Sequence, residues 1–150
     1  MSKKRQRRHY SGKKKRHTQK AQLIANPGTE KILATDFCFG KKHDFQLFQD
    51  SRSAMAPRIR ALADSGYQGL TELHSNSRTP AKKTKLHPLS KEQKASNRAL
   101  SQELILIENI IRKLKIFRIL SERYRNRRKR FGLRFNLIAA IYNMELDLVH

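Results

Sequence analysis

The sequence predicts an α/β fold, and three observations lead to that class. Two short apolar runs at residues 20–25 and 31–39, joined by an Asn-Pro-Gly turn, predict a β-hairpin. A third apolar run at residues 59–63 predicts another short strand. Residues 90–149 carry long stretches of helical apolar periodicity. We therefore expect a few strands followed by long C-terminal helices.

The charge of the chain indicates a polyanionic partner. The sequence has 34 lysines and arginines against 12 aspartates and glutamates, a net charge of +22. This excess favours nucleic acid over an anionic membrane, because tryptophan is absent and no apolar run is long enough to span a bilayer. The single cysteine, Cys38, allows no internal disulfide and suits a reducing compartment. We expect a cytoplasmic protein that associates with nucleic acid.

Two basic clusters are the expected nucleic-acid contacts. Residues 1–19 form a basic arm, typical of a disordered or extended segment, ahead of a folded domain at residues 20–150. Solvation alone could explain the arm, but the net charge favours phosphate contact. A second cluster at residues 123–130 surrounds one tyrosine with six basic residues. The candidate nucleic-acid-binding residues are Lys13, Lys14, Lys15, Arg16, Arg123, Arg125, Arg127 and Arg128.

Asp44 and Asp64 each follow a break in the chain. Asp44 is placed to cap a helix with Phe45 and Phe48 on its buried side, and this interpretation outweighs a catalytic or metal-binding pair with His43. Asp64 ends the apolar run at 59–63 and precedes Ser-Gly. It either opens a turn by accepting backbone N–H bonds or presents a carboxylate for chemistry. These residues alone favour the turn.

The rest of the chain predicts a loop and two helices. Residues 71–89 read as a basic, mobile surface loop, whose histidines fit no zinc spacing. Ser90 with Gln93 predicts a capping box that opens a helix reaching about Leu120. Residues 131–149 are apolar on several sides and predict a largely buried helix. The apolar stripe of the first helix consists of Leu100, Leu104, Ile107, Ile111 and Leu114.

Glu108 lies beside this stripe, at the margin of the buried face. Such a position can direct a carboxylate toward a site next to the helix. The alternative is an ordinary i,i+4 ion pair with Arg112 on a solvated flank. Spacing alone favours the ion pair.

As a set, these segments resemble the C-terminal catalytic part of bacterial insertion-sequence transposases of the DDE type. Any one segment is a weak signal, but together they cover nearly the whole chain and are specific. The matching segments are residues 10–18 (YSGKKKRHT), 43–45, 63–69 (ADSGYQG), 89–90, 107–108, 117–120, 123–128, 135–139 and 141–143.

The resemblance implies an RNase H-like fold and a triad of two aspartates and one glutamate that binds two divalent metals, usually Mg²⁺. The second aspartate corresponds to Asp64 and the glutamate to Glu108. Hard divalent cations prefer carboxylate oxygens, and two of them can activate an attacking hydroxyl and stabilise the leaving oxygen. The implied reaction is metal-dependent DNA cleavage and strand transfer in transposition.

This chain differs from the family at the first aspartate of the triad. In the family it lies on a strand before the YSGKKK phrase, whereas no acid precedes Glu30 here. We therefore expect a truncated RNase H-like fold that lacks its central first strand, leaves unpaired strand edges, and lacks the N-terminal DNA-recognition domain. Neither Asp36 nor Asp44 matches the missing position. We expect little or no activity from this chain alone.

Other roles stay open at this point. A companion transposase fragment, from another reading frame, or a homo-oligomer could supply the missing aspartate. A non-catalytic basic nucleic-acid-binding protein would need no carboxylate pair. A decayed remnant would have no function. DNA is the expected partner and a membrane is not.

Overall fold

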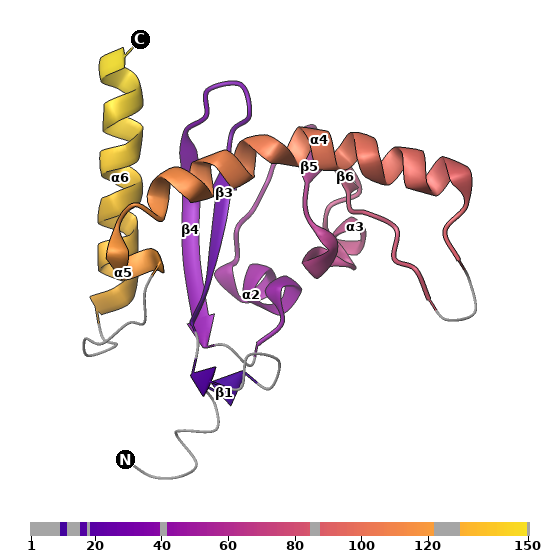
Figure 1. Ribbon diagram of the computed structural model, residues 1–150, viewed down its shortest axis with the longest axis horizontal. Coiled ribbons are helices and arrows are strands. Elements are labelled where there is room, and N and C mark those ends of the chain that lie inside the picture. The colour runs from indigo at the N-terminus through magenta and orange to yellow at the C-terminus, as the bar shows by residue number, and fades with distance from the viewer. Residues whose placement is uncertain are drawn as a thin grey trace. The chain divides into compact units, whose positions relative to one another are not determined.

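The chain forms two compact units in a computed structural model that describes residues 10–11, 16–17, 19–39, 42–84, 88–121 and 130–149 (Figure 1). The first unit contains Met1–Lys42 and Leu106–His150, and the second contains His43–Ile105. Most of the expected DNA contacts lie outside the described residues. These are Lys13, Lys14, Lys15, Arg123, Arg125, Arg127 and Arg128.

The first unit begins with two antiparallel strand pairs. β1 (Tyr10–Ser11) pairs with β2 (Arg16–His17), so part of the expected arm is strand. β3 (Gln19–Ala25) pairs with β4 (Ile32–Phe39), which confirms the predicted hairpin. In its turn, the side-chain oxygen of Asn26 accepts a hydrogen bond from the Gly28 N–H at 2.8 Å. This bond is the local reason for the Asn-Pro-Gly sequence.

α6 (Phe131–Val149) packs along β4 and forms the core of the first unit (Figure 1). The rings of Phe37 and Phe131 meet edge to face, with centroids 5.3 Å apart. A Cβ atom at Gly132 would overlap the Phe37 ring, so glycine lets the helix start this close to the strand. The buried core residues are Ile32, Ile110, Leu114, Phe131, Phe135, Ile138, Ala139 and Tyr142.

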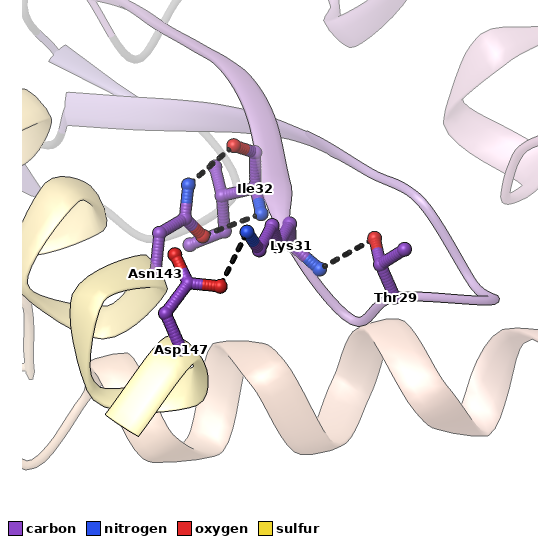
Figure 2. Close-up of polar contacts among 5 residues, drawn as sticks. All are labelled: Thr29, Lys31, Ile32, Asn143 and Asp147. Atoms are coloured by element: carbon purple, nitrogen blue, oxygen red, sulfur yellow. Dashed lines mark hydrogen bonds and ion pairs between the residues drawn. The ribbon is translucent and has the colours of Figure 1, made fainter. Parts of the chain in front are cut away.

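Polar contacts also fasten α6 to the start of β4 (Figure 2). The Asn143 amide accepts a hydrogen bond from the Ile32 N–H and donates one to the Ile32 carbonyl, both at 2.8 Å. Lys31 Nζ lies 2.5 Å from Asp147 Oδ1. These contacts fix the helix along the strand at one position, which apolar packing alone would leave less specific.

The expectation of a largely buried C-terminal helix is wrong for one of its faces. The bounds of α6 match residues 131–149, but Leu137 is 59% exposed and Met144 57% exposed. A sequence that is apolar on all sides predicts burial all round. In the structure the core covers only one side of the helix.

α4 (Lys91–Leu114) begins as the sequence predicts and ends earlier. The Ser90 N–H donates to Gln93 Oε1 at 3.0 Å and the Gln93 N–H donates to Ser90 Oγ at 3.1 Å, so the capping box is confirmed. The chain turns after Leu114 and continues as the short α5 (Arg118–Ser121). Ile110, which is outside the expected stripe, is only 1% exposed.

The second unit holds short elements around residues 44–81. α2 (Asp44–Ser51) has His43 rather than Asp44 at its N-cap position, without a side-chain cap bond, so the predicted Asp44 cap is wrong. The predicted strand at 59–63 is reduced to β5 (Ala61–Leu62). β5 is followed by the 3₁₀ turn η1 (Ser65–Tyr67) and α3 (Leu70–Leu73).

Part of the segment predicted to be a mobile loop is ordered. β6 (Ser77–Arg78) pairs in parallel with β5, and His74 and Ser77 are buried. The Asn97 amide of α4 holds the backbone of Ala81 through two hydrogen bonds of 2.9 Å. Long-range partners therefore order a sequence whose composition is that of a loop.

The predicted α/β class with long C-terminal helices is confirmed. The described strands form three two-stranded sheets, β1–β2, β3–β4 and β5–β6. No helix in the described residues is long and apolar enough to cross a membrane.

Candidate active site

Asp64 stands at the end of the β5–β6 strand pair. The Ala61 N–H donates to the Asn76 carbonyl at 2.9 Å, and the Ala63 N–H donates to the Arg78 carbonyl at 3.1 Å. These bonds continue the parallel ladder up to the residue before Asp64. The position of its backbone is therefore set by β6, which is 13 or more residues further along the chain.

The side chain of Asp64 also caps the turn that follows. Its Oδ1 accepts a hydrogen bond from the Gly66 N–H at 2.7 Å, and its carbonyl accepts one from the Tyr67 N–H at 3.2 Å. This is the turn geometry expected from Asp before Ser-Gly. Asp64 is exposed, and its Oδ2 has no hydrogen-bond partner in the described part of the chain. The turn leaves one carboxylate oxygen available for another ligand.

Gly66 has carboxylates on both sides. A Cβ atom at this position would lie 2.8 Å from Asp44 Oδ2 and 3.0 Å from Asp64 Oδ1. Two acids that are 20 residues apart in sequence are thus held beside one glycine. Sequence analysis missed this pairing, because Asp44 was interpreted only as a helix cap. The Ser-Gly step was the available signal, since glycine allows side chains to approach its backbone closely.

Gly69 fixes the other end of the motif. Its φ of 95° lies in the left-handed region, and an added Cβ would lie 2.9 Å from Phe45 Cε1. Both the backbone conformation and the nearby ring require glycine. The contact also places the segment at 43–45, at the start of α2, beside the segment at 63–69. That second segment contains the turn that Asp64 caps.

Glu108 lies on the part of α4 that belongs to the first unit, and its side chain is exposed. Within the described residues no ion pair joins it to Arg112, so the expected alternative of an i,i+4 pair is wrong. The free carboxylate is consistent with the margin position, because a group beside the buried face need not turn into it. Asp64 and Glu108 belong to different units.

The donor chemistry of both acids suits a hard divalent cation. Each is an exposed carboxylate with at least one oxygen that makes no bond to the described residues. Across those same residues, no group of three or more His, Cys, Asp and Glu side chains is assembled as a metal site. Each acid can supply a ligand, and the remaining ligands of a complete site would be water or additional protein groups.

The described residues add a basic surface that the sequence analysis did not single out. Lys91, Lys94 and Arg98 are exposed and recur at three- and four-residue steps on one face of α4. Arg58, Lys82 and Lys83, which like these residues of α4 belong to the second unit, are also exposed. Arg16, the remaining predicted DNA contact, lies in β2. Cationic side chains on one helix face are suited to phosphate contact.

Comparisons with known proteins agree with the resemblance in the sequence. Residues 1–143 match a protein family described as DDE superfamily endonuclease. A probable transposase for insertion sequence element IS702 from Microchaete diplosiphon is 49% identical over 146 residues, which are 97% of this chain and 53% of that protein. The chain therefore spans about half the length of this curated relative. No solved structure matches.

Proposed function

This chain belongs to the DDE superfamily of endonucleases, and on that premise we propose that it is the carboxylate-bearing part of an insertion-sequence transposase. In this proposal it binds DNA and takes part in metal-dependent cleavage and strand transfer. Its fold corresponds to the part of an RNase H-like fold that follows the first strand.

The exposed carboxylate of Asp64 carries this proposal. One oxygen is held by the Gly66 N–H at 2.7 Å, so the group is already oriented before any ligand arrives. The other oxygen is open to a cation. Preorientation lowers the entropy cost of binding a metal, since the carboxylate does not have to be immobilised at that moment. A bound divalent cation would supply activation of a nucleophilic hydroxyl and stabilisation of the leaving oxygen.

Glu108 is the proposed second ligand. It stands at an exposed position on a helix whose other face is fixed in the core by Ile110 and Leu114. A rigid helix gives its carboxylate a defined direction. The residue would therefore be a metal ligand rather than half of a surface ion pair.

The third carboxylate of the family pattern has to come from outside these 150 residues. No acid precedes Glu30, and Asp44 lies on α2, at a position that the family pattern does not use. We propose that this chain alone has little or no cleavage activity. Further polypeptide or a companion chain would supply the missing aspartate. A search of the neighbouring DNA for a segment that encodes it, in the same or a shifted frame, tests this part.

Metal binding and cleavage are tested with three proteins: wild type, Asp64→Asn and Glu72→Gln. Glu72 is the matched control, an exposed acid of the same unit with no proposed role. Titration with Mn²⁺ followed by electron paramagnetic resonance should show weak binding that Asp64→Asn loses and Glu72→Gln keeps. Cleavage of element-end DNA with Mg²⁺ or Mn²⁺ should be close to background for all three proteins.

Two results would contradict different parts of the proposal. Strong cleavage by wild type that disappears in Asp64→Asn would disprove the expected inactivity and support the ligand assignment. Metal binding that is unchanged in Asp64→Asn, and also in Glu108→Gln as a fourth protein, would disprove the assignment. It would favour the second candidate function, that of a non-catalytic nucleic-acid-binding protein. The net charge of +22 also supports this function.

DNA binding is tested through its dependence on salt. We propose contacts from Lys13, Lys14, Lys15, Arg16, Arg123, Arg125, Arg127 and Arg128, and from the basic face of α4. Lys94→Gln with Arg98→Gln should weaken binding to all sequences and reduce the slope of log affinity against log salt by about two. An unchanged slope would remove this face from the interface.

A further inference from the structure

α6 has two apolar faces, and the described residues cover only one of them. The core face contains Phe131, Phe135, Ile138, Ala139 and Tyr142, all buried. On the opposite side the large apolar side chains are exposed: Leu133 by 69%, Leu137 by 59%, Met144 by 57% and Leu148 by 79%. An exposed helix face is normally polar, so this second face needs a partner of its own.

The exposed residues form one continuous stripe along the helix. The stripe, called the outer stripe here, consists of Leu133, Leu137, Ala140, Met144 and Leu148. Its members follow one another at steps of three or four residues, which places them on a single face. Ala140, a small residue, lies near its middle and would let another helix approach closely. The stripe extends from Leu133 to Leu148, about 23 Å at 1.5 Å per residue.

We propose that the outer stripe is the surface on which two copies of this chain associate, with their α6 helices antiparallel. Charge favours a second copy at this place. The chain carries +22, so two copies repel each other over most of their surfaces. α6 is an exposed apolar element without this positive charge, since its only charged residues are Arg134, Glu145 and Asp147, a net charge of −1.

The charges beside the stripe also specify the direction of the partner helix. Arg134 near the start of α6 and Glu145 near its end are 11 residues apart, close to three full turns, and therefore lie on the same flank. An antiparallel partner related by a two-fold axis brings Arg134 of each copy toward Glu145 of the other. A parallel two-fold partner would place the two flanks on opposite sides of the interface, so that neither of these ion pairs could form. The surface is thus complementary to itself, as a two-fold interface requires.

The first test measures association in solution. Nucleic acid is removed by nuclease and high salt, because a basic protein can be bridged by DNA. Sedimentation velocity over a range of concentrations should show a monomer–dimer equilibrium for wild type. Leu137→Ser with Met144→Ser should raise the dissociation constant by about tenfold or more for each side chain. Leu33→Ser, at a 65% exposed leucine of β4, is the matched control and should change nothing.

The second test determines the direction of pairing by oxidative cross-linking in a Cys38→Ser background. Ala140→Cys lies near the two-fold axis of an antiparallel pair and should form a disulfide-linked dimer. Leu148→Cys lies near the end of α6, far from its own copy in that pair, and should stay uncross-linked. Efficient cross-linking of Leu148→Cys instead would show parallel pairing and disprove the proposed arrangement.

An exchange of the charges at Arg134 and Glu145 distinguishes a loss of association from a folding defect, because the second substitution should restore the dimer. Arg134→Glu should weaken the dimer, because it places two acids together, and addition of Glu145→Arg should restore it. Circular dichroism checks that all variants keep their helices. A wild-type chain that is monomeric at every concentration, or a dimer that survives the double serine variant, would overturn the proposal. None of these measurements depends on metal binding or cleavage.

Discussion

Each unit contains an asparagine whose side-chain amide binds the backbone N–H and carbonyl of one distant residue. The two amides lie in very different surroundings. In the first unit, the Asn143 amide binds the N–H and the carbonyl of Ile32, beside a core of aromatic and branched side chains. In the second, the Asn97 amide binds the N–H and the carbonyl of Ala81 in the same way, at the end of a long irregular segment. The first amide adds specificity to a packed core. The second is one of the few contacts that hold its segment.

The difference indicates what each region depends on. Apolar burial is non-directional and is shared by many atoms, so the hairpin and α6 should tolerate the loss of one polar contact. The segment that carries Asp64 depends on single donors and acceptors. Its contacts include His74 Nε2 to the Ile59 carbonyl at 2.5 Å and Gln68 Nε2 to the Pro80 carbonyl at 2.9 Å. Small polar changes should therefore disturb the candidate site more than they disturb the core.

The largest effect is expected from Phe135→Ala in the core of the first unit. Phe135 is 3% exposed, and removal of its ring leaves a cavity, which should cost about 3–5 kcal/mol of unfolding free energy. Ile116→Ala, at a 79% exposed side chain, should cost less than about 0.5 kcal/mol. Urea denaturation followed by circular dichroism measures both. Equal losses in the two variants would mean that this core does not stabilise the fold.

The next largest effect is expected from Gly69→Ala in the second unit. Alanine at a φ of 95° is strained, and its Cβ would press on the Phe45 ring, for an expected cost of about 1–3 kcal/mol. Hydrogen exchange of the amides in residues 61–81 should report the loosening. Gly28→Ala, where the nearest atom is Asn26 Oδ1 at 3.4 Å, provides the control and should leave exchange unchanged. Unchanged exchange in Gly69→Ala would contradict the proposed role of this turn.

Loss of two hydrogen bonds should have different structural consequences at Asn143 and at Asn97. Asn143→Ala and Asn97→Ala each remove two hydrogen bonds, worth about 1–3 kcal/mol. Asn143→Ala should lower the denaturation midpoint while the helix stays packed by its apolar face. Asn97→Ala should speed hydrogen exchange mainly in residues 76–84. If Asn143→Ala instead exposed all of α6 to exchange, the apolar core would not be the main support of that helix.

The smallest effect at neutral pH is expected from Tyr142→Phe. Burial raises the pKa of the Tyr142 hydroxyl, an effect that nearby Lys113 opposes, and this hydroxyl has no hydrogen-bond partner within the described residues. The folded state thus favours the neutral phenol. The stability that this preference provides is complete below about pH 10 and is lost as the pH rises through the folded pKa.

Removal of the hydroxyl should therefore change the pH profile more than the stability itself. At pH 7 Tyr142→Phe should be neutral or slightly stabilising, because no hydrogen bond is lost. Between about pH 10 and 12 it should lose less stability than wild type. Thermal melts across this range measure the difference. A parallel decline in both proteins would show that other groups govern alkaline unfolding.

Local signals in the sequence predicted the elements whose causes are local. The capping box at Ser90 and the Asn-Pro-Gly turn involve residues no more than three apart, and both appear as predicted. The bounds of α6 followed from its high apolar content. In each case the residues that form the structure are also neighbours in the sequence, so their pattern is sufficient.

Features made by distant partners could not be predicted in this way. β6 consists of Ser77 and Arg78, which have no strand pattern and are ordered by pairing with β5. The approach of Asp44 to Gly66 depends on how α2 packs beside the turn. The exposed side of α6 also carries large apolar residues, so the apolar pattern alone does not show which face the core covers. The candidate site depends on contacts of this kind, and its residues came from the family resemblance.

The Asn143 amide also affects whether another strand can pair with the edge of β4. In an antiparallel ladder, alternate residues of an outer strand turn their N–H and carbonyl groups away from the partner strand. On β4 these groups are occupied at Ile32 by Asn143, and the Phe37 N–H donates to Asp36 Oδ1 at 2.7 Å. At these two positions another polypeptide strand would have to displace the side chains of Asn143 and Asp36 before it could pair with β4. Occupied backbone groups of this kind hinder the pairing of strand edges that leads to aggregation.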